Sequence, residues 1–412
     1  NIITKSSAHK KNIYFVQRSS MGKESIGLAQ NIDLGDIKVS IDGYFKTNKG
    51  ARDTGPYQYK NLFGVTSTLN GTSYEDYENH SLGAKITLYD DLSFQFRFTE
   101  HDTQNFYGYG EWPVTQDPKY LQSTSNFGEV RYSPTLSRNL SLDLRAGYRE
   151  FIFEGQARIK PYATTTPYTH DLIADGYIRE GSMYSDNILK YTLDKHDMLF
   201  GVYLSETQQI LMDYYFNNPG YLPTPTYPAA SNNPTILNAG IDKDISRYQY
   251  ALYFNDIYTI SDRFIANVGL RYDNYNDIDS NLAHKFALVY NQNEKDTYKL
   301  MYQRSFRVPS WLELYGKSLP YLGSASLKPE IIDTVEFTYN HQNRLDNYFS
   351  INLFYSKMKN YITDQSYTFI NGGNVKSHGV ELEAKIPVSS FTTLQANYSY
   401  VNMKDAQNNS IS

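Results

Sequence analysis

Apolar and polar residues alternate along most of the chain, and the clearest example runs from Arg247 to Asp273. Two alternating stretches are separated there by a short polar turn at Ser261 and Asp262. Strict alternation on both sides of a short turn predicts an antiparallel β-hairpin with one apolar face and one polar face. The apolar face is expected to carry Tyr248, Tyr250, Leu252, Phe254, Phe264, Ala266, Val268, Leu270 and Tyr272, with Asn267 and Arg271 on the opposite face.

The same unit repeats along the chain, and the connections between strands alternate in length. Short polar turns are expected at Asp90 to Asp91, Pro134 to Asn139, Asp194 to Lys195 and Asn291 to Asp296. Long connections are expected at about 47–79, 101–124, 151–181, 206–245 and 305–330. Short turns at one end and long loops at the other are typical of a bacterial outer-membrane barrel, whereas a β-sandwich has no reason to sort its turns in this way. We predict an all-β fold, an antiparallel transmembrane β-barrel with about 17 strands.

Composition supports a membrane barrel over a soluble protein. Of the 412 residues, 40 are tyrosine and 15% are aromatic, which fits the aromatic girdles that mark both membrane boundaries of such barrels. The mean hydropathy of −0.57 is compatible with a barrel, because only every second strand residue meets lipid. The net charge of −5 and the lack of a basic block give no sign of nucleic-acid binding. The absence of cysteine excludes disulfides and thiolate metal sites.

Several motifs resemble those of the TonB-dependent outer-membrane receptors. The start, NIITK, resembles the end of that family's plug domain, and SFRVPSWLELYG at 305–316 resembles its "FRAPS…ELY" motif with Val308 in place of Ala. SLKPE at 326–330, INLFYSKMKNYI at 351–362 and NGGNVKSHGVELEAK at 371–385 resemble segments that follow in the family. The resemblance implies residues 1–5 as the end of the plug domain and 6–412 as a partial β-barrel of an expected 22 strands, in the bacterial outer membrane.

The resemblance implies active transport of a scarce ligand, most often a ferric siderophore, energised by TonB in the full-length protein. The implied partners are outer-membrane lipid, the protein's own plug domain and the TonB complex, with the plug, the TonB-contacting segment and about five strands expected outside this chain. This chain alone is therefore not expected to carry out energised transport. The alternative functions are a passive porin-type channel, or the same receptor class with haem, cobalamin or carbohydrate as ligand. Haem is the less favoured ligand because residues 312–328 contain no histidine.

No catalytic constellation, cofactor site or metal site is predicted. The paired carboxylates Glu381 and Glu383 are interpreted as part of a polar lumen wall, and His101-Asp102 and His170-Asp171 as solvated loop residues. The residues expected to face the lumen and the plug are Lys38, Arg97, Arg145, Asn267, Arg271, Lys299, Glu381 and Glu383. Aromatic rings and arginines in the extracellular loops could bind a flat anionic chelate, or the rings could belong to the outer girdle. These ligand-binding candidates are Arg52, Phe106, Tyr107, Tyr109, Trp112, Arg179, Tyr214, Tyr215, Trp311 and Tyr315.

Overall fold

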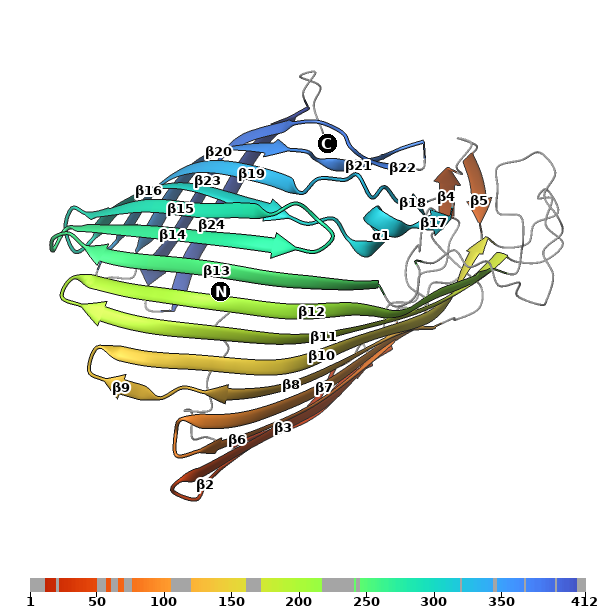
Figure 1. Ribbon diagram of the computed structural model, residues 1–412, viewed down its shortest axis with the longest axis horizontal. Helices are drawn as coiled ribbons and strands as arrows, with labels where there is room; N and C mark the ends of the chain where they lie inside the picture. Colours follow the sequence, from red (N-terminus) through yellow and green to blue (C-terminus); the bar gives the residue numbers. More distant parts are fainter. Residues whose placement is uncertain are drawn as a thin grey trace.

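The structure, a computed structural model, is one large curved antiparallel sheet with small additions at one end (Figure 1). It describes residues 12–19, 22–49, 57–60, 66–69, 76–104, 120–160, 172–216, 241, 245–318, 321–343, 347–366, 368–389 and 391–405. Within these ranges, no helix is long and apolar enough to cross a membrane.

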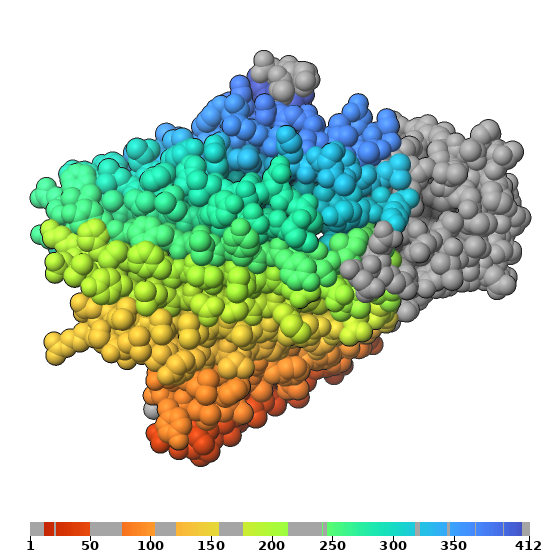
Figure 2. Space-filling view, in the orientation of Figure 1, coloured from red at the N-terminus to blue at the C-terminus, as the bar shows by residue number. Residues whose placement is uncertain are grey.

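Consecutive strands of the large sheet pair with each other, so that chain order and spatial order coincide. Within the described ranges the sheet has 18 strands, and 17 remain when the three-residue β9 beside β10 is set aside, in agreement with the predicted number of about 17. Figure 2 shows the same order as bands of colour that follow one another from one edge of the wall to the other. The strands are β1 (Ile13–Arg18), β2 (Lys23–Asp33), β3 (Ile37–Asn48), β6 (Tyr77–Leu88), β7 (Leu92–Gln104), β8 (Tyr120–Tyr132), β9 (Thr135–Ser137), β10 (Leu140–Lys160), β11 (Leu172–Leu193), β12 (His196–Phe216), β13 (Ile245–Thr259), β14 (Phe264–Tyr275), β15 (Asn281–Asn291), β16 (Asp296–Arg307), β19 (Glu330–Gln342), β20 (Tyr348–Lys359), β23 (Val375–Ser389) and β24 (Thr392–Lys404).

The remaining elements lie in the connections. One two-stranded sheet joins β4 (Tyr57–Lys60) and β5 (Thr66–Leu69). A second small sheet contains β17 (Lys317–Ser318), β18 (Tyr321–Leu322), β21 (Ile362–Gln365) and β22 (Thr368–Asn371). The short helix α1 (Trp311–Tyr315) follows β16. In Figure 1 these elements gather at the end opposite the tight turns, which is the end expected to face the cell exterior.

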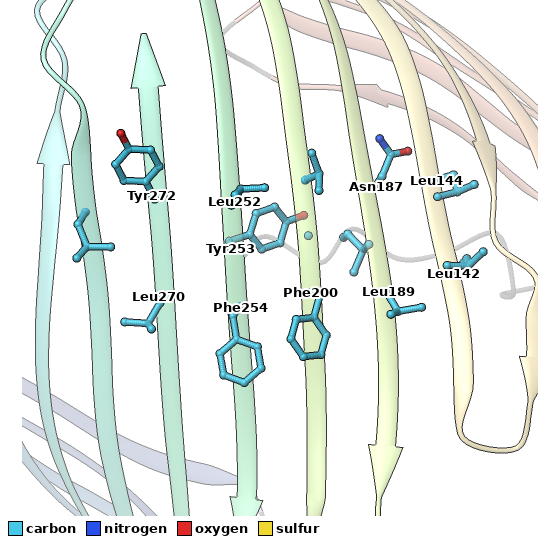
Figure 3. A pocket seen from close by; sticks show the side chains of 14 residues that line it. Leu142, Leu144, Asn187, Leu189, Phe200, Leu252, Tyr253, Phe254, Leu270 and Tyr272 are labelled. Carbon is cyan, nitrogen blue, oxygen red and sulfur yellow. The ribbon is translucent and has the colours of Figure 1, made fainter.

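The two faces of the hairpin β13–β14 separate as the alternation predicts. Leu252 pairs with Tyr272 on the apolar face, and Tyr253 pairs with Arg271 on the polar face. The apolar side chains remain open, with Leu252 55% exposed, because no protein layer covers them. Figure 3 shows this face, where Leu142, Leu189, Phe200, Phe254 and their neighbours border a hollow of about 500 Å³. An uncovered apolar face of this extent matches the lipid-facing wall of a membrane barrel.

The tight turns have the backbone that short hairpins require. Tyr89 and Asp90 between β6 and β7 have φ values of 50° and 63°, and Asp194 between β11 and β12 has a φ of 47°. Positive φ at the centre of a short turn matches the turn's twist to that of the flanking strands. The turns predicted at these two places are confirmed.

The strands extend further toward the outer end than the alternation predicts. The connections expected at 151–181 and 206–245 are wrong in their bounds, because β10 continues to Lys160, β11 begins at Leu172 and β12 continues to Phe216. Similarly, β7 continues to Gln104 through a stretch expected to be loop. Beyond the membrane both faces of a strand meet water, so backbone pairing continues without an alternating pattern in the side chains.

Candidate functional site

One arginine joins two of the resembling motifs at the outer end of the sheet. Arg307, the last residue of β16, donates to Glu330 at 2.5 Å and to both carboxylate oxygens of Glu313 at 2.9 and 3.0 Å. Glu313 belongs to α1 and Glu330 begins β19, and their side chains are only 14% and 10% exposed. Glu330 also accepts the backbone N–H of Ile362 at 2.7 Å. We call Arg307, Glu313 and Glu330 the arginine hub.

Local capping explains why a five-residue helix forms beside the hub. Pro309 and Ser310 precede α1, and the Ser310 side chain accepts from the Glu313 backbone while the Glu313 side chain accepts from the Ser310 backbone. This reciprocal capping box satisfies two N–H groups that would otherwise lack partners. Leu314 at the other end of the helix packs with Leu327 and Ile362 in a small buried cluster.

The resembling segment at 371–385 also contacts this region, through Asn371. Asn371 accepts from the backbone N–H of Lys328 at 2.9 Å, and its amide donates to the carbonyls of Lys328 at 3.1 Å and Asn360 at 2.8 Å. Asn360 in turn donates to the carbonyl of Pro329 at 3.2 Å. Segments that resemble one family at three separate points of the sequence therefore form one contact network.

Helix α1 folds over the concave side of the sheet. Trp311 is 9% exposed and packs with Met212 of β12 and with Ile241. Since β13, β14 and β15 separate β12 from β16, Trp311 can join a cluster with Met212 only across the concave side, and Ile178 on β11 packs against the same cluster. Arg247 on β13 lies over the Trp311 ring at 5.0 Å and forms an ion pair with Asp277 at 2.9 Å. The helix is therefore fixed at two places: at the end of β16, which it follows, and against β12 and β13 on the other side of the concave face.

The charges around α1 are held in defined states. Burial raises the pKa of Glu313, but hydrogen bonds from Arg307 and Ser310 outweigh it, so the net pKa of this carboxyl is below its ordinary value. Burial and the neighbouring Asp277 carboxylate raise the pKa of the Tyr315 phenol. At neutral pH, Glu313 is therefore an anion and Tyr315 is a neutral hydrogen-bond donor to Asp277 at 3.4 Å.

Below α1, the concave wall carries arginines against tyrosine rings. Arg149 lies 4.9 Å from the centre of the Tyr184 ring and donates to the Tyr203 hydroxyl at 3.2 Å. Arg271 lies 5.6 Å from the Tyr203 ring and 5.3 Å from the Tyr253 ring. Arg271 is neutralised by Asp273, whereas Arg149 is exposed and forms no ion pair among the residues that the structure describes, its nearest carboxylate influence being a longer-range interaction with Glu180 on β11. We call Arg149, Tyr184 and Tyr203 the open-arginine wall.

The residues predicted to face the lumen lie on the polar face, opposite the exposed apolar residues. Three of them are arginines in ion pairs: Arg97 with Asp42 at 2.9 Å, Arg145 with Asp143 at 2.7 Å and Arg271 with Asp273 at 2.8 Å. Lys38 pairs with Asp90, and Glu381 accepts from Asn352 at 3.2 Å. The buried Oδ1 of Asn267 has no hydrogen-bond partner among the described residues. Lys299 and Glu383 have Thr338 and Ser350 opposite them on the neighbouring strands. Contact of these residues with a plug stays a prediction.

The predicted ligand-binding residues divide into three groups. Arg52, Phe106, Tyr107, Tyr109 and Trp112 lie outside the described residues. The loop position predicted for Arg179, Tyr214 and Tyr215 is wrong, because β11 and β12 include them. Arg179 forms an ion pair with Glu150 at 2.6 Å. Trp311 and Tyr315 do lie in a connection, but in α1, where Trp311 is covered.

Two further expectations concern histidines. His101 and Asp102 were expected together in a loop, but both lie in β7, where consecutive residues point to opposite faces. They therefore cannot bind one metal ion together. His170 and Asp171 lie outside the described residues.

The open-arginine wall is not among the sites predicted from the sequence. Arg149, Tyr184 and Tyr203 come from three strands, so their spacing in the sequence gives no motif. The available signal was that tyrosines occupy the polar register of β11 and β12. Among the tyrosines, only those in the expected loops are predicted as ligand-binding candidates, so this signal in the strands is not used.

An apolar outer face, a polar inner face and, in the described residues, seventeen antiparallel strands besides β9 define an outer-membrane β-barrel wall, and the chain lies in the outer membrane of a Gram-negative bacterium. The model of the family described as TonB dependent receptor-like, beta-barrel matches residues 26–412. The chain belongs to this family, whose members are transport receptors rather than enzymes.

Solved structures show the same fold at low sequence identity. The ferric yersiniabactin uptake receptor FyuA of Yersinia pestis matches with a TM-score of 0.65 and 14% identity, covering 95% of this chain and 60% of that one. A mutant of the ferric enterobactin receptor PfeA of Pseudomonas aeruginosa gives 0.66 and 14%, covering 94% and 60%. The copper transporter OprC gives 0.69 and 12%, covering 97% and 62%. The chain thus spans about three fifths of the length of these structures. A search of curated proteins gave no match.

Proposed function

We propose that this chain is the barrel part of a TonB-dependent receptor that takes up a ferric siderophore across the outer membrane, with TonB energising the full-length protein. Membership of the receptor family over residues 26–412 carries the proposal. The proteins of similar fold include the ferric yersiniabactin uptake receptor and the ferric enterobactin receptor.

The open-arginine wall supports an anionic ligand. An exposed arginine that is not engaged in an ion pair can form charge-assisted hydrogen bonds with an anionic group, and such bonds are about twice as strong as neutral ones. Tyr184 and Tyr203 are stacked with ring centres 6.4 Å apart, and they offer flat apolar surfaces next to that charge. A ferric chelate with aromatic or carboxylate donor groups combines the two properties that this wall would bind.

The level of Arg149 along its strand is consistent with a binding role. Tyr148, its neighbour on the outer face, is followed by Glu150, where the outward face turns from apolar to charged. Arg149 therefore lies near the outer boundary of the apolar band, below α1, where a ligand entering from outside would reach it.

The test uses the full-length protein, in cells and after purification. Iron-starved cells that lack the gene should lose uptake of at least one ferric siderophore, and the gene should restore it. Purified protein should bind that siderophore, and Arg149→Ala should weaken binding by about tenfold, since a hydrogen bond to a charged group contributes about 1.5 kcal/mol or more. Arg138→Ala is the matched control, because Arg138 is an exposed arginine beside the short turn at the other end of β10.

Three outcomes would contradict parts of the proposal. Normal uptake of every ferric siderophore tested, in cells without the gene, would exclude siderophore transport. Equal binding by the Arg149 and Arg138 variants would remove Arg149 from the site but leave the transport assignment standing. A constitutively open channel of the full-length protein in bilayer recordings would instead favour a passive porin.

A further inference from the structure

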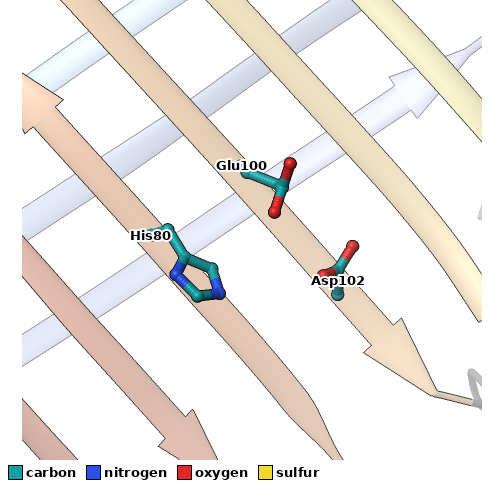
Figure 4. A group of neighbouring side chains, drawn as sticks. All are labelled: His80, Glu100 and Asp102. Atoms are coloured by element: carbon teal, nitrogen blue, oxygen red, sulfur yellow. The ribbon is translucent and has the colours of Figure 1, made fainter.

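Three side chains with metal-binding groups meet on the outer face of the sheet, away from the wall just described. His80 lies on β6, and Glu100 and Asp102 lie on β7 (Figure 4). One ligand atom from each lies within 4.8 Å of the others. We call these three residues the outer triad.

The strand register places the outer triad just beyond the lipid-facing band. Leu82 pairs with Phe98 on the outer face, and the next pair on that face is His80 with Glu100. Glu78 opposite Asp102 follows on the same face. Since both strands belong to a continuous ladder, the backbone that holds the three groups is rigid.

Within the described part of the chain, no lysine or arginine neutralises the negative charge of the triad. Among the residues that the structure describes, no lysine or arginine forms an ion pair with Glu100 or Asp102. The nearest arginine in sequence, Arg97, points to the opposite face and pairs with Asp42. Glu78 adds a further carboxylate 3.8 Å from Nε2 of His80. All three triad residues are half-buried, so their charges are only partly screened by water.

The imidazole is also held in place. The ring centre of Phe45 on β3 lies 4.9 Å from that of His80, with the rings inclined at 60°. This contact limits the rotation of the histidine side chain. A ligand set with one oriented imidazole and two carboxylates suits a first-row transition metal, because Mg²⁺ and Ca²⁺ prefer sites made of oxygen ligands alone.

We propose that the outer triad binds one divalent transition-metal ion of the Zn²⁺ class at the outer rim of the barrel. Bonds of about 2.0–2.2 Å to three protein ligands leave the fourth tetrahedral position to water. Ligand atoms at the observed separations reach such bonds by small changes in side-chain rotamers. The ion would join β6 to β7 above the membrane and stabilise this part of the wall, since a ligand that binds only the folded state favours it.

The test measures Zn²⁺ binding by the full-length protein in detergent after treatment with a chelator. Titration calorimetry and metal analysis should show one Zn²⁺ fewer per protein for His80→Ala than for the unmodified protein, with affinity at the site reduced at least about tenfold. Glu100→Gln should give the same loss. The control is His378→Ala, because His378 is an exposed histidine on β23 that belongs to no group of metal ligands within the described residues.

Stability provides a second readout for the same proposal. Zn²⁺ should raise the unfolding temperature of the unmodified protein and of the His378 variant, but not that of the His80 or Glu100 variants. Equal Zn²⁺ stoichiometry in all four proteins would overturn the proposal, as would the absence of Zn²⁺ binding to the unmodified protein. Variants that retain the heat-modifiable migration of a folded barrel exclude misfolding as the cause of lost binding.

Discussion

Replacement of Arg307 by alanine should release helix α1 from the wall without unfolding the barrel. The change removes three hydrogen bonds to carboxylates and leaves Glu313 and Glu330, which are 14% and 10% exposed, without their cation. Breaking a fully buried ion pair costs about 3–5 kcal/mol. Arg307 is itself 48% exposed, and solvent screening reduces the cost to about 2 kcal/mol. That figure corresponds to an increase of about thirtyfold in the undocked population of α1.

Trp311 provides the assay, because it is buried when α1 is docked. The chain has two tryptophans, so a Trp112→Phe background makes the fluorescence specific for Trp311. In this background, Arg307→Ala should shift the emission to longer wavelength and increase quenching by acrylamide. Amide exchange should accelerate in residues 311–315 and remain slow in the flanking strands.

Arg304→Ala is the matched control, because Arg304 lies on the same strand and pairs with Asp333 at 2.7 Å without contacting α1. Equal quenching of Trp311 in the two variants would refute the assignment of the hub.

The pH dependence of helix docking gives an independent check of the same assignment. The folded-state pKa of Glu313 is below its ordinary value of 4.5, so its contribution is complete above that value and is lost as pH falls through the lowered pKa. Acid should therefore weaken the docking of α1 in the unmodified protein, and it should weaken docking less in the Arg307→Ala variant.

Three other predictions follow from the wall itself. Asp143→Ala should lower the free energy of unfolding by about 3 kcal/mol in urea titrations, because Asp143 is 2% exposed and neutralises both Arg131 and Arg145; an unchanged midpoint would contradict this. Leu252→Arg should cost about 2–4 kcal/mol on folding into lipid vesicles, whereas Gln303→Arg on the polar face should cost less, and equal costs would reverse the assignment of the faces. In intact cells, a cysteine at Ser326 should react with an impermeant maleimide and one at Ser261 should not, since these positions lie at opposite ends of the wall.

Alternation was enough to predict the fold within the membrane. In β13 and β14 the residues expected on each face are on that face, because a one-residue change of register would place Arg271 in lipid. Beyond the lipid boundary, the alternation of apolar and polar residues no longer predicts how far each strand extends. In β10, outward positions run from Tyr148 to Glu150, and the strand nevertheless continues to Lys160. Main-chain hydrogen bonds hold that extension together, and they leave no trace in the choice of side chains.

Site residues were predictable only where a motif is local. The resemblance of residues 305–316 to a known motif drew attention to the segment around α1, but only Trp311 and Tyr315 were predicted there as ligand-binding residues. The ion pairs of Arg307 with Glu313 and Glu330 emerge only from the structure. The open-arginine wall is assembled from β10, β11 and β12, whose register fixes which residues meet. The outer triad depends in the same way on His80 facing Glu100 across a turn. The pairing register between strands determines which side chains meet in such sites. The amino-acid composition of the strands gives no information about that register.

The point where each outward face changes from apolar to charged gives the barrel an internal depth scale. Leu82 is followed by His80 toward the outer end of β6, Phe98 by Glu100 on β7, Tyr148 by Glu150 on β10 and Leu204 by Glu206 on β12. Four strands thus change at the same type of position, as they must if one planar boundary crosses the wall. Arg149 lies at the level of this boundary, on the concave face of the wall. The arginine hub lies beyond the boundary, toward the cell exterior. A ligand held by Arg149 would therefore be within the membrane-embedded barrel, and α1 would lie between it and the exterior.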